Sequence, residues 1–115
     1  TPEGENRQAR QMVEMYTALF AHPLVEAVTT WDFTDGNWLG APSGVLRQDN
    51  SIKPAYLALQ EKIKKDWWTK ENAVTDKEGR LSLTGYKGDY EITCSAGKAR
   101  FCLDRDGGEI VVRLA

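Results

Sequence analysis

The hydrophobic positions in the first half of the chain recur with two different periods. Across residues 6–21 the apolar side chains return every third or fourth position, which is typical of an amphipathic helix. Residues 25–33 form a β-branched, apolar run, which predicts a strand. A second helical period covers residues 53–66, and Pro54 is tolerated in its first turn because the missing N–H would have no helical partner. Helix, strand and helix in this order form one step of an α/β pattern.

The second half of the chain changes to a period of two. Short runs alternate between apolar and polar residues, and glycine-containing turns separate them. This pattern predicts a small antiparallel β-sandwich or meander, which would be marginally stable alone. We therefore expect an α+β chain with two domains, residues 1–68 and residues 69–115. The expected strands contain residues 81–83, 90–94, 99–103 and 110–114.

The long loop over residues 34–51, which joins the predicted strand to the second predicted helix, is the candidate binding site. Loops of this length in compact domains are usually functional, and this one carries Trp38 in a polar, glycine-bearing turn. Trp31 and Asp35 lie close to it in the sequence. Flat aromatic faces on which a pyranose ring can stack, beside a carboxylate that binds its hydroxyls, are typical of a sugar site. The alternative is that both tryptophans belong to the core of a buried strand.

Composition removes several classes of function. A formal net charge of −2 with no long basic run argues against nucleic acid as the main partner. No apolar run reaches the length that crosses a membrane. The chain begins at Thr1 with neither an initiator Met nor a signal peptide, so we expect a mature, trimmed or partial sequence.

Metal and cofactor chemistry also lacks the necessary residues. His22 is the sole histidine and is expected at a helix end, so no two-histidine metal site can form. Two cysteines and one histidine do not complete a zinc site, and no phosphate-binding glycine motif is present. We expect no metal, no cofactor and no nucleophilic triad.

The two cysteines are expected to remain unpaired. If Ala96-Gly97 form a two-residue hairpin loop, Cys94 lies opposite Ala99 and faces the core, whereas Cys102 points to the other face of the sheet. Side chains on opposite faces do not have the converging Cβ vectors that a disulfide needs.

Several motifs, in order along the chain, carry a resemblance to a known family. They are Gln8-Ala9-Arg10-Gln11, Ala21-His22-Pro23-Leu24-Val25-Glu26-Ala27-Val28, Trp31-Asp32-Phe33-Thr34-Asp35 and Lys53-Pro54-Ala55-Tyr56. Together they resemble the C-terminal end of glycoside hydrolase family 10, the endo-β-1,4-xylanases built on a (β/α)8 barrel. Residues 1–68 would be the last helix, strand and helix of that barrel. Residues 69–115 resemble the small β domain appended to plant-type members, through Thr75-Asp76-Lys77-Glu78-Gly79-Arg80 and Gly85-Tyr86-Lys87-Gly88-Asp89-Tyr90.

The resemblance implies a role for the tryptophans. Trp31 would stand at the C-terminal end of the eighth strand, where barrel active sites lie, and would wall a xylan-binding subsite together with Trp38. The family supplies its two catalytic glutamates from the fourth and seventh strands, which would lie before Thr1. Asp32 and Asp35 do not replace them, because at a strand end they would point to different sides. We therefore expect no catalytic residue in this chain, and no activity from the chain alone.

Two functions remain open. The first is the C-terminal part of a xylanase-like enzyme that degrades a β-1,4-linked polysaccharide and is extracellular or periplasmic. The alternative is a non-catalytic module whose β domain binds carbohydrate or a partner. In the first case the strand over residues 25–33 would have two open edges, so we expect it to pair with the remaining barrel or with a second copy.

Overall fold

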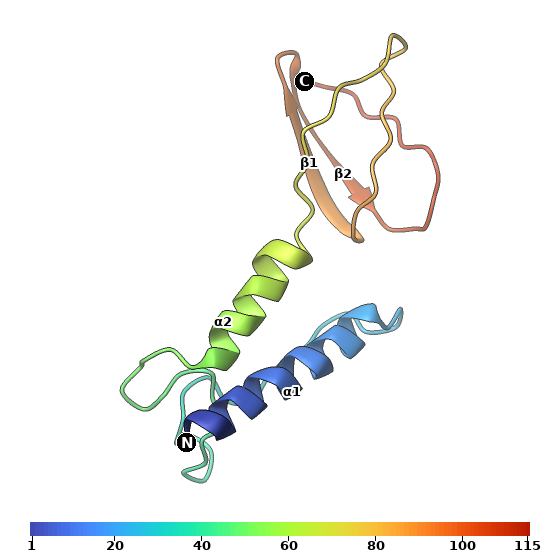
Figure 1. Ribbon diagram of the computed structural model, residues 1–115. Helices are drawn as coiled ribbons and strands as arrows, with labels where there is room; N and C mark the ends of the chain where they lie inside the picture. The colour runs from blue at the N-terminus through green and yellow to red at the C-terminus, as the bar shows by residue number, and fades with distance from the viewer. The chain divides into compact units, whose positions relative to one another are not determined.

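The structure, a computed structural model, describes all 115 residues and contains two compact units (Figure 1). Unit 1 is Thr1–Trp67 and unit 2 is Trp68–Ala115. Unit 1 contains the helices and unit 2 contains a two-stranded antiparallel sheet. The chain is therefore a small α+β protein. None of its helices combines the length and the apolar character that crossing a membrane requires.

Two helices form the body of unit 1. Helix α1 (Pro2–Ala21) begins earlier than the sequence pattern predicts, because the Thr1 hydroxyl accepts a hydrogen bond from the Gly4 N–H at 3.1 Å and caps the helix. Helix α2 (Pro54–Glu61) continues into a π-helical turn, η1 (Lys62–Asp66). The prediction of a second helix ending near residue 66 is confirmed.

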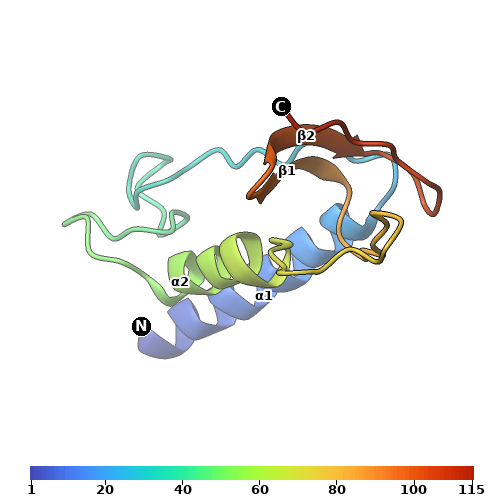
Figure 2. The same cartoon turned by 90° about the horizontal axis from the view of Figure 1, so that it is seen from above.

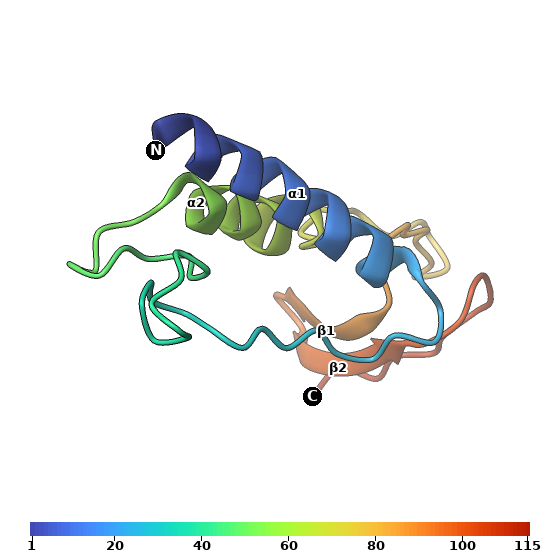
Figure 3. The same ribbon diagram turned by 90° about the horizontal axis from the view of Figure 1, so that it is seen from below.

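The core of unit 1 lies between these helices, which run side by side (Figure 3). Small side chains allow the close approach, since Ala9 of α1 and Ala55 of α2 are both buried. Farther along, the rings of Phe20 and Trp67 stack with centroids 4.3 Å apart. The other buried apolar residues are Val45 and Leu59. Because the buried apolar set is small, polar contacts carry much of the order in the connecting loop.

The predicted strand over residues 25–33 is wrong. The segment is extended but unpaired (Figure 2), and residues 26–32 take part in no backbone hydrogen bond. Pairing is limited to isolated bridges, in which Leu46 pairs with Thr34 in parallel and with Ile52 in antiparallel orientation. The physical reason is that a strand is defined by a neighbour, and unit 1 offers none along this segment.

Unit 2 is built on one hairpin of β1 (Gly88–Cys94) and β2 (Gly97–Leu103). Its turn is Ser95-Ala96, because Cys94 pairs with Gly97. The expected register is therefore wrong, since Ile92 pairs with Ala99 and not with Phe101. A shift by an even number of residues keeps the same side chains on each face, so apolar pattern alone does not distinguish the two registers.

The rest of unit 2 contains no further strand. The expected strands over residues 81–83 and 110–114 are wrong, although Ala115 exchanges two backbone hydrogen bonds with Lys98 of β2, both 3.1 Å long. Cys94 and Cys102 are free, as predicted. The core position expected for Cys94 is wrong, because both cysteines are exposed in this two-stranded hairpin.

Candidate functional site

Trp38 lies in a tight turn within the loop that joins the extended segment to α2. The turn is closed by backbone hydrogen bonds from Gly36 N–H to Ala41 C=O (2.9 Å) and from Ala41 N–H to Trp38 C=O (2.8 Å). Three residues have positive φ, namely Gly36 at 91°, Leu39 at 52° and Gly40 at 71°. Only glycine adopts this conformation freely, so the turn carries some strain at Leu39.

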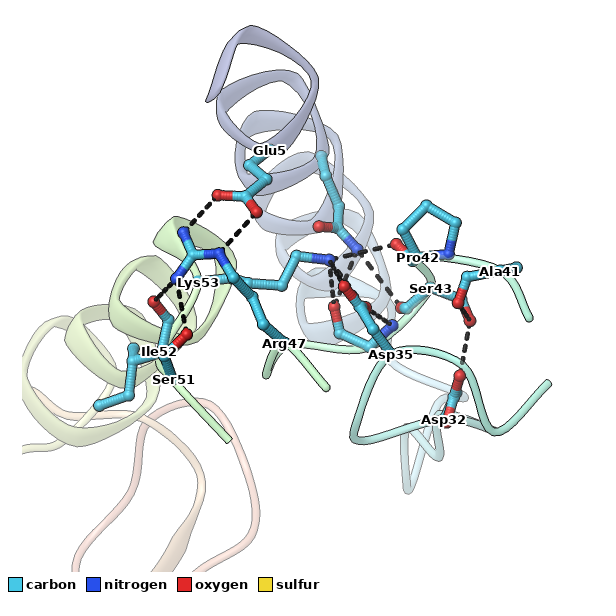
Figure 4. A network of polar contacts seen from close by, with 12 residues as sticks. Glu5, Asp32, Asp35, Ala41, Pro42, Ser43, Arg47, Ser51, Ile52 and Lys53 are labelled. Carbon is cyan, nitrogen blue, oxygen red and sulfur yellow. Dashed lines mark hydrogen bonds and ion pairs between the residues drawn. The ribbon is translucent and has the colours of Figure 1, made fainter. Parts of the chain in front are cut away.

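A buried ammonium group joins the two ends of this turn (Figure 4). Lys53 is only 1% exposed, and its Nζ donates to Asp35 Oδ1 at 3.0 Å and to Oδ2 at 3.2 Å. It also donates to the Pro42 C=O at 3.1 Å and the Gly44 C=O at 2.9 Å. The charge is thus paired and hydrogen-bonded, as a buried charge must be.

Gly44 completes this arrangement on the far side of the turn. Its N–H donates to Asp35 Oδ1 at 2.9 Å, and its C=O accepts from Gln8 Nε2 of α1 at 3.1 Å. A Cβ at this position would come within 2.6 Å of the Phe33 carbonyl oxygen. The backbone of residues 33–35 can approach this closely only because residue 44 has no side chain.

A second polar cluster holds the loop to the start of α1 (Figure 4). The Arg47 guanidinium donates to Glu5 Oε1 at 2.8 Å and to Glu5 Oε2 at 2.5 Å. Its remaining nitrogen donates to Ser51 Oγ at 3.1 Å and the Ile52 C=O at 2.9 Å. The hydrogen bond with Arg47 holds the pKa of Glu5 below its ordinary value of 4.5.

An open, shallow cavity of about 360 Å³ lies beside these two clusters. Its polar lining residues include Asp35, Arg47, Gln48 and Asp49. Among the Asp, Glu, His and Cys side chains of the chain, no group of three or more could hold a metal ion. The chemistry available here is hydrogen bonding, with the carboxylates of Glu5 and Asp35 already paired.

The predicted site residues differ in their surroundings. Trp31 is 89% exposed and Trp38 is 51% exposed, so neither ring belongs to the core of unit 1. The oxygens of Asp35 accept hydrogen bonds from Lys53 and Gly44, which makes this residue part of the support of the turn. Asp32 accepts a hydrogen bond from Ser43 Oγ at 2.6 Å, which connects two parts of the loop.

Sequence analysis missed the residues that organise the loop. Lys53, Arg47 and Glu5 come from separate places in the chain, and no spacing rule links them. One signal was present, because Lys53 occupies the N-cap position of α2, where Ser, Thr, Asp or Asn is preferred. A lysine there is unfavourable near the helix N-terminus unless an anion pairs with it.

Comparison with known proteins finds distant relatives. The chain is 28% identical over 112 residues to the anti-sigma-I factor RsgI6 of Acetivibrio thermocellus, which covers 94% of this chain and 14% of that protein. It is also 28% identical over 117 residues to endo-1,4-beta-xylanase 1 of Arabidopsis thaliana, which covers 95% of this chain and 12% of that protein. No protein-family model matches the chain.

These matches indicate the class of protein to which the chain is related only in broad terms. The similarity to a xylanase indicates a distant, glycoside hydrolase-like origin. The identity to a protein named as an anti-sigma factor is equally high, so the matches do not point to one kind of protein. In each case the chain spans less than a sixth of the relative's length, at 14% and 12%.

Proposed function

We propose that this chain is the C-terminal part of a xylanase-like glycoside hydrolase and supplies aromatic walls to a subsite for a β-1,4-linked polysaccharide. The observation that carries the proposal is the presentation of Trp38. Its ring is half exposed on a turn whose two ends are joined by the buried Lys53 ammonium. A flat aromatic surface held by a supported loop suits the stacking of a pyranose ring. The similarity to a plant xylanase over 95% of the chain also supports this proposal.

In the proposed function, this chain does not supply the catalytic carboxylates. A retaining glycosidase needs two carboxyl groups about 5 Å apart on either side of the scissile bond. In this chain the two aspartates between Trp31 and Trp38 in the sequence are engaged in the loop itself, since Asp32 accepts from Ser43 and Asp35 from Lys53. The proposed contribution of the chain is therefore substrate binding.

The test is the affinity of the purified chain for soluble xylan, measured by affinity electrophoresis. Trp38→Ala should weaken binding by about tenfold, because one stacking face worth on the order of 1.4 kcal/mol is lost. The matched control is Trp68→Ala, which removes another exposed tryptophan, 59% exposed, from unit 2. Equal affinity of Trp38→Ala and the unmodified chain, or no binding by the unmodified chain, would contradict the proposal.

A second candidate is binding of carbohydrate by unit 2. The observation in its favour is an open cavity of about 410 Å³ on the hairpin, next to the stacked rings of Tyr90 and Phe101, whose centroids lie 5.2 Å apart. Tyr86, 44% exposed, lies next to this hairpin, since its C=O accepts a hydrogen bond from the Tyr90 hydroxyl. Loss of xylan affinity in Tyr86→Ala, together with unchanged affinity in Trp38→Ala, would favour this second function.

A further inference from the structure

The contacts of Lys53 come from both sides of the Trp38 turn. Asp35 precedes the turn, whereas the Pro42 and Gly44 carbonyls follow it. An ammonium group has three protons, and here four acceptor atoms lie within 3.2 Å of it. All the hydrogen-bonding capacity of Lys53 is thus spent on joining the entry and the exit of one turn.

Stability alone is a poor explanation for this arrangement. A buried ion pair is costly to desolvate and is often no more stabilising than apolar residues of the same volume. An effect on the conformation of the turn is a better explanation, because the turn includes Leu39, a non-glycine residue at a φ of 52°. Such a conformation persists only where the surrounding structure imposes it. The Lys53 contacts impose it by fixing both ends of the turn.

We propose that Lys53 is a positioning residue for the Trp38 turn. It holds residues 35–44 in the conformation that presents the indole ring, and it does so without touching the ligand. The effect on sugar affinity rests on the function proposed above. The effect on the order of the turn does not, so the two can be tested separately.

The experiment compares matched variants of the whole chain. Lys53→Met removes the ammonium but keeps most of the side-chain volume. Lys65→Met is the control, because it makes the same change at a lysine that is 70% exposed and pairs with Glu61. The double variant Lys53→Met with Asp35→Asn also removes the carboxylate that would otherwise be left buried without its partner.

The decisive readout is amide hydrogen exchange at Gly36 and Ala41, whose N–H groups are bonded inside the turn. Both Lys53 variants should exchange at least about tenfold faster there than the unmodified chain, which corresponds to about 1.4 kcal/mol. The double variant should nevertheless regain most of the resistance to urea that the single variant loses. A residue with only a stabilising role would recover both properties together.

The outcomes separate the two proposals. Unchanged exchange at Gly36 and Ala41 in the double variant would overturn the positioning role. Fast exchange in that variant, with Lys65→Met unchanged, supports it even if the single variant fails to fold. If the unmodified chain does not bind xylan, the proposed function fails, and the exchange data still decide the role of Lys53. If it binds, the double variant should bind at least about fivefold more weakly despite its restored stability.

Discussion

At the scale of single residues, the loop depends on polar side chains that meet from distant positions in the sequence. Arg47 and Glu5 are 42 positions apart, and Lys53 and Asp35 are 18 apart. The two pairs differ in exposure, since the Lys53 side chain is 1% exposed whereas that of Arg47 is 40% exposed. Solvent screens the Glu5–Arg47 pair, so its contribution to stability should be small. It should also depend on pH, because Arg47 lowers the pKa of Glu5.

The Glu5–Arg47 pair should make the stability of unit 1 sensitive to acid. Arg47 holds the pKa of Glu5 below 4.5 in the folded chain, so the unfolded chain takes up this proton first as the pH falls. The stabilisation by this pair is therefore fully present above the pKa that Glu5 has in the unfolded chain. It is lost as the pH drops through the lower pKa that Glu5 has in the folded chain. Urea unfolding followed by helical circular dichroism at about pH 6, 4.5 and 3 should show this loss.

The comparison variants for this prediction lie on the same helix. Glu5→Gln removes the titrating group and should flatten the acid-dependent part of the curve. Glu14→Gln, at an exposed position of α1, should retain it. An identical pH profile for the unmodified chain and Glu5→Gln would show that the pair contributes nothing measurable.

At the scale of elements, the helices depend on interactions between residues a few positions apart, whereas the loop depends on close contact between two backbone segments. A capping hydroxyl at Thr1 and an apolar stripe are sufficient to start and orient α1. The loop instead requires the Gly44 backbone to lie against three backbone atoms, with Phe33 O, Asp35 N and Thr34 C all within 2.7 Å of where a Cβ would be. This close backbone contact makes Gly44 sensitive to substitution even though its φ is not positive.

Gly44→Ala should destabilise unit 1 by about 1–3 kcal/mol, because an added methyl group has no room and must displace the backbone. The matched control is Gly4→Ala in α1, where the nearest atom to the added Cβ would be the Thr1 hydroxyl oxygen at 3.2 Å. That change should be neutral or stabilising by up to about 1 kcal/mol, because alanine favours the helix. Urea unfolding measures both, and equal midpoints would contradict the crowding argument.

Much of the secondary structure could be predicted at this scale, and the failures have a common cause. The sequence predicts the two helices and the faces of the hairpin, because these features depend on neighbours a few residues away. Residues 25–33 have strong β propensity, yet they form no strand because pairing needs a partner that propensity does not supply. The role of Lys53 could not be predicted either, since two of its four acceptors are backbone carbonyls of a folded turn and the other two belong to Asp35, 18 positions away.

At the scale of the whole molecule, the unpaired segment exposes both backbone groups and large apolar side chains. Residues 26–32 make no backbone hydrogen bond, and the residues around them include Leu24 at 83% exposed and Phe33 at 59% exposed. An extended segment of this kind is a template for pairing with another strand. In the proposed function the partner is the rest of the barrel, and we expect a second copy to pair with the segment when the barrel is absent.

The isolated chain should therefore self-associate as its concentration rises. Thr29→Pro should reduce the association, because proline removes an N–H and fits poorly in a paired strand, while both units stay folded. Ala73→Pro, at an exposed position of unit 2, is the control and should associate like the unmodified chain. Light scattering measures the mass, and association of Thr29→Pro at the unmodified level would place the contact elsewhere.

The amino-acid sequence by itself determined the elements whose interactions are local: both helices, the two faces of the hairpin and the separation of a helical half from a β half. The tertiary structure alone decided which residues support the Trp38 turn, which hairpin register is adopted and whether the apolar segment becomes a strand. The physical reason is the range of the interactions. Helix capping and side-chain periodicity act over a few positions along the chain, whereas a buried ion pair or a strand partner exists only after distant segments have come together.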